Sequence, residues 1–276
     1  MARGWVGGVQ YGEPPAGRHG PSRMLKLSPD EAAVLKAVCA DRDTDLPRLV
    51  YADWLDDHDR PERAEFIRLQ VTATRQPSDH TGYQIEPRIG ELLAAHRDRW
   101  LRELPKWAVV TGPHAFVRGF VEVFDMPAGP FTLTAPQLLD RTPVRRLILR
   151  SLRKVAPNLT RCGWLGEVPS LWLLNERLGD DAVTDLMTAP WLVNSRELNL
   201  VGNDLTDRAA RALANCPYLR GLVRLDLGRN QLGRTGVEWL LASPHLTACR
   251  FSFWANERLN ADRHAVERLL GPRGTL

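Results

Sequence analysis

The second half of the chain repeats one pattern at a nearly fixed interval. Residues 195–205 read Ser-Arg-Glu-Leu-Asn-Leu-Val-Gly-Asn-Asp-Leu, and residues 222–232 read Leu-Val-Arg-Leu-Asp-Leu-Gly-Arg-Asn-Gln-Leu. These copies start 27 residues apart, an interval that indicates structural units stacked side by side. The shared pattern is Leu-x-Leu-x-x-Asn-x-Leu, and its copies, one weaker and one aromatic, begin at Leu147, Leu171, Leu198, Leu225 and Phe251.

Each copy predicts a short strand that ends in a turn. The alternating leucines have the period of a strand with one buried face. The Asn after the strand can bond backbone groups of the neighbouring unit that would otherwise be buried without partners. Asn203, Asn230 and Asn256 hold this structural turn position. Glu176 and Leu152 replace it in the two earlier copies, so we expect less regular turns there.

A helix follows each predicted turn, and the expected helices span 180–187, 207–214, 234–241 and 261–270. Thr206 or Asp207 is a suitable cap for the second of them. Pro190, Pro217 and Pro244 recur every 27 residues and are expected to stop the helices. One strand and one helix cannot bury their own apolar face, so neighbouring units must stack.

Because strand, Asn, helix and proline recur together, residues 147–276 resemble the leucine-rich repeat family in its ribonuclease-inhibitor-like subtype. The resemblance implies an α/β fold, a solenoid with a curved parallel sheet inside and helices outside. The alternative is a chance run of leucine-rich strand–helix units in an ordinary α/β sheet. The joint recurrence favours the repeat family.

The N-terminal residues divide into a tail and a helical segment. Residues 1–27 form a Gly/Pro-rich tail that we expect to be disordered, and Met24 rather than Met1 is our hypothesis for the true start. The intact mass of the native protein would test that hypothesis. Residues 28–104 predict a small all-α domain that begins with Ser28 as a helix cap and Glu31 completing a capping box.

Further helices are expected from Thr44, from Pro61 and over residues 85–101. The first helix is expected to bury Ala33, Val34, Ala37 and Val38. The second is expected to bury Leu46, Leu49, Val50 and Trp54. The third is expected to bury Ala64, Phe66, Ile67, Leu69 and Val71.

Two runs in the helical segment carry a second resemblance. Residues 48–55 read Arg-Leu-Val-Tyr-Ala-Asp-Trp-Leu, and residues 63–70 read Arg-Ala-Glu-Phe-Ile-Arg-Leu-Gln. They resemble the bacterial repeat-companion domain, which stands ahead of leucine-rich repeats; at residues 57–59, Asp-His-Asp departs from that family's Gly-containing turn. The resemblance extends the architecture and implies a bacterial protein, but it implies no activity. Residues 105–146 are then a transitional or degenerate first repeat, with a strand at 116–124 and a helix at 134–139.

Composition and motifs exclude several classes of protein. No apolar run of 18 residues exists, so a membrane-spanning helix is excluded, and the start lacks the apolar segment of a secretory signal. The four cysteines form no C-x-x-C pair, and we expect them to be buried residues of a reduced, cytoplasmic protein. Catalytic motifs are absent, so we expect no enzyme, no catalytic residue, no cofactor and no metal site.

The acidic residues from Asp53 to Glu62 lack the spacing of a calcium loop. A solvated helix end is therefore favoured there over a divalent-ion site. Asp53 and Glu65 are candidates to pair with a cation nearby, namely Arg48, Arg63 or Arg68.

The inner strand surface is the best candidate for function. Residues that alternate with the leucines should point away from the core and form three rows across the sheet. The rows are Arg146, Ser170, Glu197, Arg224 and Arg250; Ile148, Trp172, Asn199, Asp226 and Ser252; and Arg150, Leu174, Val201, Gly228 and Trp254. Exposed Trp and Arg dominate binding energy, so the predicted protein-binding residues are Trp172, Arg224, Asp226, Arg250 and Trp254.

These observations predict a non-catalytic protein-recognition module or scaffold whose protein partner and oligomeric state the sequence does not name. A first alternative is a regulator of another enzyme, either an inhibitor or a GTPase activator, because similar repeat subtypes act in this way. A second alternative is nucleic-acid binding through the basic cluster from Arg141 to Lys154. The net charge of only +4, together with Glu197 and Asp226 on the same surface, argues against nucleic acid.

Overall fold

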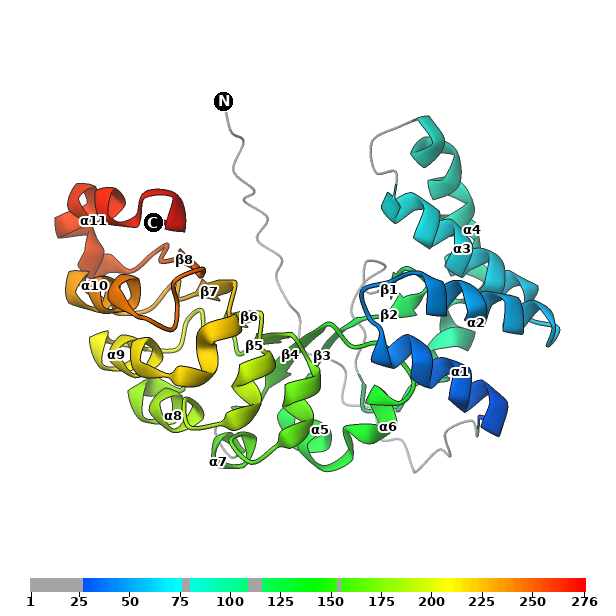
Figure 1. Cartoon of the computed structure of the whole chain (residues 1–276), viewed down its shortest axis with the longest axis horizontal. Coiled ribbons are helices and arrows are strands. Elements are labelled where there is room, and N and C mark those ends of the chain that lie inside the picture. Colours follow the sequence, from blue (N-terminus) through cyan, green and yellow to red (C-terminus); the bar gives the residue numbers. More distant parts are fainter. Residues whose placement is uncertain (1–26, 76–79, 109–115, 153–154) are drawn as a thin grey trace.

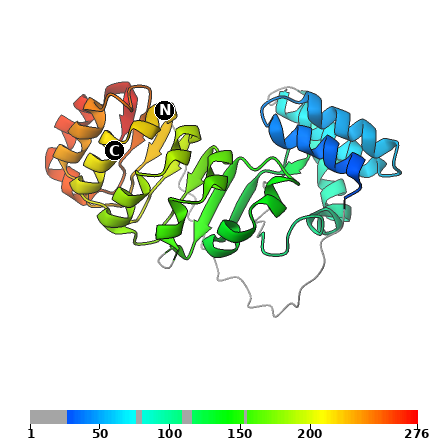
Figure 2. The ribbon, with the colours of Figure 1, turned by 60° about the horizontal axis from the view of Figure 1, so that its bottom comes forward.

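The computed structural model describes residues 27–75, 80–108, 116–152 and 155–276. The predicted disordered tail, apart from Leu27, therefore lies outside the described residues. The described chain forms an arc, with four helices at one end and a sheet that follows the inner side toward the other end (Figures 1 and 2). The fold is mixed α/β with a seven-stranded parallel sheet.

The four helices at the N-terminal end are α1 (Pro29–Ala40), α2 (Leu46–Asp56), α3 (Pro61–Arg75) and α4 (His80–Leu101). Ser28 caps α1 as predicted, since its hydroxyl accepts from the Glu31 N–H at 3.1 Å. The Glu31 carboxylate does not close a capping box; it accepts hydrogen bonds from Tyr51 and Arg60 instead. Helix α4 begins at His80 rather than at residue 85 and carries Pro87 in its interior.

The buried faces of the first two helices differ from the predicted stripes. In α1 the buried apolar residues are Leu35, Val38 and Cys39, and Ala33 and Ala37 are exposed. In α2 the buried residues are Arg48, Tyr51, Ala52 and Leu55. Leu46 and Val50, which were expected in the core, are 70% and 49% exposed. In α3 the prediction is mostly confirmed, because Ala64, Phe66, Ile67 and Val71 are buried and Leu69 is half-buried.

Arg48 explains the orientation of α2. Its guanidinium donates to the Glu122 carboxylate at 2.7 Å, and both side chains are fully buried. Residues two positions apart lie on nearly opposite sides of a helix, so an inward Arg48 turns Leu46 and Val50 toward solvent. A stripe chosen by hydrophobicity alone misses this, because an ion pair places the charged residue in the interior.

Charged groups also join the helical end to the sheet. Arg48, Arg118 and Arg145 all donate to the Arg42 carbonyl in the loop between α1 and α2. The same three guanidinium groups surround Glu122, with nitrogen–oxygen distances of 2.7, 3.9 and 2.7 Å. We call Arg48, Arg118, Glu122 and Arg145 the junction cluster. It connects α2, the hairpin described next and the start of the second strand of the main sheet.

The single strand predicted over residues 116–124 is wrong. The segment instead forms the antiparallel hairpin β1 (Phe116–Val117) and β2 (Phe120–Val121), and β3 (Val123–Pro127) follows. Arg118 and Gly119 form the turn with φ values of +47° and +89°. A side chain at Gly119 would meet Ile67 Cγ1 of α3 at 2.3 Å, so glycine permits the close approach. The predicted short helix at 134–139 corresponds to α6 (Pro136–Leu139), and an unpredicted helix, α5 (Ala128–Thr134), precedes it.

The seven parallel strands follow one another in chain order, one per unit. They are β3, β4 (Arg146–Arg150), β5 (Ser170–Trp172), β6 (Glu197–Asn199), β7 (Arg224–Asp226), β8 (Arg250–Ser252) and β9 (Gly274–Thr275). The register aligns the first leucine of each copy with that of the next, from Leu147 through Leu198 to Phe251. Strand β9 was not predicted, because its two residues carry no hydrophobic pattern.

Helices cover the outer side of the sheet (Figure 1). They are α7 (Ala156–Leu159), α8 (Gly179–Leu186), α9 (Asp207–Asn215), α10 (Arg234–Ala242) and α11 (Arg263–Leu270). The predicted α8, α9 and α10 are confirmed to within one residue at each end, and Thr206 caps α9 through a bond from the Arg208 N–H. The last predicted helix starts late, because its first residues belong to a 3-10 helix, η6 (Glu257–Asp262).

Short 3-10 helices lead from the outer helices back to the strands. They are η3 (Gly163–Glu167), η4 (Pro190–Asn194), η5 (Pro217–Gly221) and, near the C-terminal end, η7 (Gly271–Arg273). Pro190 and Pro217 each occupy the first position of a 3-10 helix. The N–H group at that position has no partner within the helix, so its absence in proline loses no hydrogen bond.

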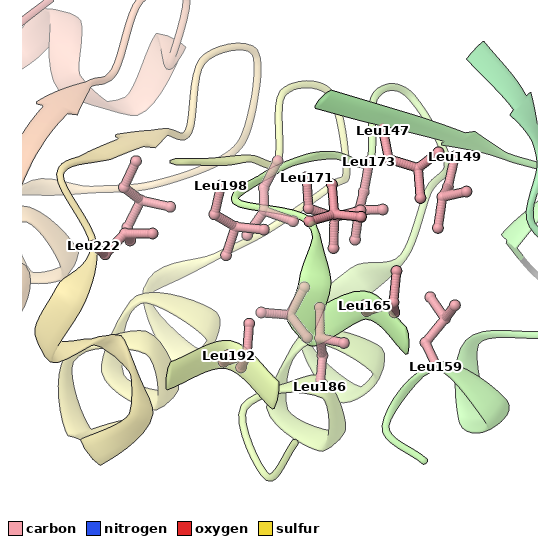
Figure 3. Packing of buried hydrophobic residues seen from close by; sticks show 14 of the residues in the cluster. Leu147, Leu149, Leu159, Leu165, Leu171, Leu173, Leu186, Leu192, Leu198 and Leu222 are labelled. Carbon is pink, nitrogen blue, oxygen red and sulfur yellow. The ribbon is translucent and has the colours of Figure 1, made fainter. Parts of the chain in front are cut away.

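The core lies between the strands and the outer helices. Figure 3 shows leucines of neighbouring strands, such as Leu147, Leu171 and Leu198, directed toward leucines of the outer segments, such as Leu186 and Leu192. All five are at most 4% exposed. Burial of apolar area at about 25 cal/mol per Å² is therefore the main stabilising contribution here.

The turn asparagines form a ladder of hydrogen bonds between units, as predicted. Asn230 Oδ1 accepts from the N–H groups of Asn203 and Leu205, and Nδ2 donates to the carbonyls of Leu200 and Leu227. Asn203 and Asn256 likewise bridge to the preceding unit. Each amide thus satisfies buried backbone groups of two units at once.

The early turns were expected to be less regular, and the Glu176 turn does contain two further residues with positive φ, Arg177 and Gly179. The Glu176 carboxylate accepts from the Leu152 N–H at 2.8 Å, so it takes over the acceptor role of the asparagine amide but not its donor role. The backbone also repeats in all five copies, because the residue before the turn position has a positive φ between 52° and 70° throughout. These residues are Ser151, Asn175, Gly202, Arg229 and Ala255.

Candidate functional site

The strand register brings the predicted rows together across the inner side of the sheet. Arg146 pairs with Ser170, Ser170 with Glu197, Glu197 with Arg224 and Arg224 with Arg250. The second row follows two residues later, from Ile148 to Ser252. We call the three rows the strand face. The opposite side of the strands carries the buried leucines, so the hydrophobic core supports the strand face from behind.

Glu197 is the electrostatic centre of the first row. Its carboxylate accepts from the Ser170 hydroxyl at 2.6 Å and from Arg146 at 3.1 Å, and Arg224 lies farther away at 3.5 Å. Partial burial alone would raise the pKa of Glu197, but these hydrogen bonds and the neighbouring positive charges hold that pKa below its usual value. Glu197 is therefore ionised at neutral pH and engaged mainly by Arg146 and Ser170.

Trp172 is half-buried beneath a cation. The Arg146 guanidinium lies 4.2 Å from the centre of its ring, and the indole nitrogen is buried without a hydrogen-bond partner among the described residues. Of the predicted binding residues, Trp172 thus offers only part of its surface.

Asp226 and Trp254 form a local pair. The Asp226 carboxylate accepts from the Gly228 N–H at 3.0 Å and also interacts with Ser252 and Trp254. Burial raises the pKa of Asp226, and these hydrogen bonds only partly offset it. The Trp254 ring lies against Gly228, where a Cβ would stand 2.2 Å from its Nε1 atom. Trp254 is therefore held flat and remains 42% exposed, whereas Asp226 is directed toward its own neighbours.

Arg224 and Arg250 are the most accessible charges of the strand face. They are register partners on adjacent strands, and both are exposed. The Arg224 side chain is 65% exposed. Among the described residues, Arg250 takes part in no ion pair within 4.0 Å, and the carboxylate paired with Arg224 is that of Glu197 at 3.5 Å. Of the five predicted residues, these two and Trp254 are thus the ones best placed to meet a partner.

The basic cluster near β4 is largely engaged within the protein. Arg145 binds Asp43 and Glu122, and Arg146 binds Glu197. Arg150 makes a two-pronged contact with Asp125 on β3 at 2.9 Å, and Arg141 donates to the Glu103 carbonyl. Arg153 and Lys154 lie outside the described residues. Each of the four described arginines therefore has at least one partner within the protein.

The acidic turn after α2 also makes internal contacts. Asp53 and Asp56 bind Arg68 at 2.6 and 2.7 Å, which confirms one of the predicted pairings. Glu65 binds Arg88 instead of a residue named from the sequence. Within the described ranges, no three His, Cys, Asp or Glu side chains gather as metal ligands do. No described helix is both long enough and apolar enough to cross a membrane.

Sequence reasoning missed the contribution of β3 to this surface. Asp125 lies in register with Ile148 and anchors Arg150, so the polar network extends one strand beyond the predicted rows. The alternation in residues 116–124 was assigned to one strand, which hid the true start of β3. No protein-family model matches this chain, and a search of curated proteins finds none that matches it.

Proposed function

We propose that residues 147–276 are a leucine-rich-repeat solenoid of the ribonuclease-inhibitor-like subtype, and that the strand face binds a protein partner without catalysing a reaction. The registered strands, the asparagine ladder and the outer helices support the repeat assignment. Residues 28–104 are proposed to be a repeat-companion domain, joined to the repeats through residues 105–146 and the junction cluster.

One observation carries the binding proposal. Trp254, Arg224 and Arg250 are exposed close together on strands and turns whose other side is packed in the core. Trp and Arg are the residue types that contribute most to protein interfaces. Because a rigid frame loses little conformational freedom on binding, more of the contact energy becomes affinity.

The four cysteines are free and buried, which suits a reducing compartment, and we propose the bacterial cytoplasm. The partner is proposed to be a protein, and an enzyme regulated by this chain is the principal alternative to a scaffold. The two differ in whether the captured partner changes its reaction rate on binding.

The test is affinity capture from a lysate of the source organism with three forms of the chain. The first is wild type. The second replaces the predicted residues with Ala: Trp172, Arg224, Asp226, Arg250 and Trp254. The third replaces the same residue types away from the strand face: Trp164, Trp239, Arg208, Arg234 and Asp181. Circular dichroism first establishes that all three are folded.

The proposal expects one protein to be captured by wild type and by the third form, which is changed away from the strand face. The second form, which is changed on the strand face, should not capture it. That protein, once purified, should bind wild type directly. Equal capture by all three forms would contradict the strand face as the binding surface. A captured enzyme whose rate changes on binding would favour the regulator.

A further inference from the structure

We propose that the partner presents an acidic segment, with carboxylates that bind Arg224 and Arg250 and an adjacent apolar side chain that packs on Trp254. This inference rests on the proposed function, because it names the chemistry of the partner of the same surface. Its basis is the distribution of charge over the strand face, where the arginines at one end have closer carboxylate partners than those at the other end.

At the β3–β6 end, each cation has an acidic neighbour. Arg150 binds Asp125 through both oxygens, and Arg146 binds Glu197. A partner that approached these arginines would have to displace an existing ion pair. This half of the strand face therefore has little free charge to offer.

At the β7–β8 end, two cations stand side by side. Arg224 and Arg250 are register partners, and neighbouring strands lie about 4.8 Å apart. The nearest carboxylate to Arg224 is Glu197 at 3.5 Å, which Ser170 and Arg146 already engage at shorter distances. Two exposed guanidinium groups on adjacent strands can bind one or two carboxylates, for which guanidinium has matching donor geometry.

Asp226, the nearest acidic residue on β7 itself, does not cancel this charge. Its carboxylate is turned toward the Gly228 N–H and toward Ser252 and Trp254. In that position it interacts with Trp254, which lies against Gly228 and remains 42% exposed. Trp254 lies in the turn after β8, at most roughly 13 Å from Arg250 along the chain, so the surface pairs a cationic site with an apolar platform.

A protein segment fits this arrangement better than a nucleic acid does. A nucleic acid carries a charge at every phosphate and gains affinity from a continuous positive track. Here Asp125, Glu197 and Asp226 interrupt the surface, and the unmatched cations are confined to one pair of strands. A short cluster of Asp or Glu beside an apolar residue places its charges only where the arginines are free.

The test uses a fluorescein-labelled peptide of four glutamates, two glycines and a phenylalanine, with fluorescence anisotropy as the readout. Comparison peptides replace the glutamates with glutamines or with lysines. A labelled single-stranded oligonucleotide with as many negative charges tests for a general preference for polyanions. The proteins are wild type, the double variant Arg224→Glu/Arg250→Glu, and a control with the same change of charge, Arg234→Glu/Arg263→Glu. The control residues begin α10 and α11 and pair with Glu238 and Glu267.

We expect wild type and the control variant to bind the glutamate peptide at least about tenfold more tightly than the glutamine peptide. That is the change expected from one hydrogen bond to a charged group. The Arg224→Glu/Arg250→Glu variant should lose this preference and should bind the lysine peptide instead. Trp254→Phe should weaken binding of the glutamate peptide less than the double variant does.

Three results would overturn the inference: no preference of wild type for glutamate over glutamine, equal loss in the control variant, or tighter binding of the oligonucleotide than of the peptide. Failure of the proposed function is separate. If the captured partner depends on the strand face but tolerates Arg224→Glu/Arg250→Glu, protein recognition stands and the acidic segment is wrong. If no captured partner depends on the strand face at all, the proposed function itself fails.

Discussion

The two ends of the arc are held by different kinds of interaction. From β4 onward, the units stack through buried leucines and through amide side chains that bridge backbone groups. At the N-terminal end, the helices share this apolar core through Phe66 and Trp100, and they also meet the sheet through the junction cluster, in which Glu122 faces three arginines. The repeats rely on many similar, uncharged contacts, whereas the junction adds a few buried charged contacts to its apolar packing.

This difference determines how each region responds to substitution. A repeat unit shares its contacts with two neighbours, so the loss of one side chain is spread over a continuous core. The junction places a guanidinium and a carboxylate out of reach of water, where neither is tolerated without the other. The junction should therefore be the more sensitive region for a single polar substitution.

The largest expected effect is at Glu122. The Glu122→Ala substitution leaves Arg48 buried without its carboxylate, and we expect the free energy of unfolding to fall by about 3–5 kcal/mol. Urea unfolding followed by circular dichroism measures it. As a control, Arg48→Met/Glu122→Leu removes both charges and should recover most of the loss. A loss of under about 1 kcal/mol for Glu122→Ala would show that the junction does not depend on this pair.

The ladder asparagines should differ from one another in a predictable order. Asn230→Ala removes the acceptor for two N–H groups and the donor for three carbonyls, and we expect a loss of about 2–4 kcal/mol. Asn256→Ala removes the acceptor for one N–H group and the donor for two carbonyls and should cost about half as much. Equal losses in thermal or urea unfolding would mean that the number of bonds is not what matters.

Substitutions on the exposed face of α2 should have a smaller effect on the free energy of unfolding, and they test which face of the helix is buried. Leu46→Gln and Val50→Gln change exposed residues, so each should alter the free energy of unfolding by no more than about 0.5 kcal/mol. Leu55→Ala, on the buried face of the same helix, should cost about 2–5 kcal/mol. The two glutamine variants would be the costly ones if the stripe predicted from the sequence were the buried one.

The smallest expected effect is at Asp226 and depends on pH. Burial raises the pKa of Asp226 in the folded chain, so the stability it contributes is full below the unfolded value of about 3.9 and declines as the pH rises through the folded value. Asp226→Asn does not titrate and should gain stability relative to wild type as the pH rises above about 3.9, by no more than about 0.5 kcal/mol. A stability gain of Asp226→Asn that grew as the pH fell would contradict the raised pKa of Asp226.

The same contrast explains what the sequence could predict. Strand positions, outer helices and turn asparagines follow from a period that places chemically similar residues in equivalent places, as Leu198 and Leu225 illustrate. The helical end offers no such period, and hydrophobicity assigned the wrong side of α2, because Arg48 enters the interior only in company with Glu122, 74 residues away. Strand β9 was missed for a related reason: Gly274 and Thr275 pair through their backbone alone.

The candidate site was predictable in part. Strand alternation placed the rows correctly, since it depends only on the position of the leucines. It does not report which charges are already paired. The engagement of Asp226 by the Gly228 N–H and the covering of Trp172 by Arg146 depend on side-chain geometry that no spacing in the sequence reveals.

The most direct test of the strand-face proposal is hydroxyl-radical footprinting of the chain with and without its captured partner. Three tryptophans serve as matched reporters, because Trp254 on the strand face, Trp164 on η3 and Trp239 on α10 are 42%, 43% and 38% exposed. We predict that the partner slows oxidation of Trp254 several-fold and leaves Trp164 and Trp239 unchanged. Protection of Trp164 or Trp239 with no change at Trp254 would place the partner elsewhere and contradict the strand face as the recognition surface.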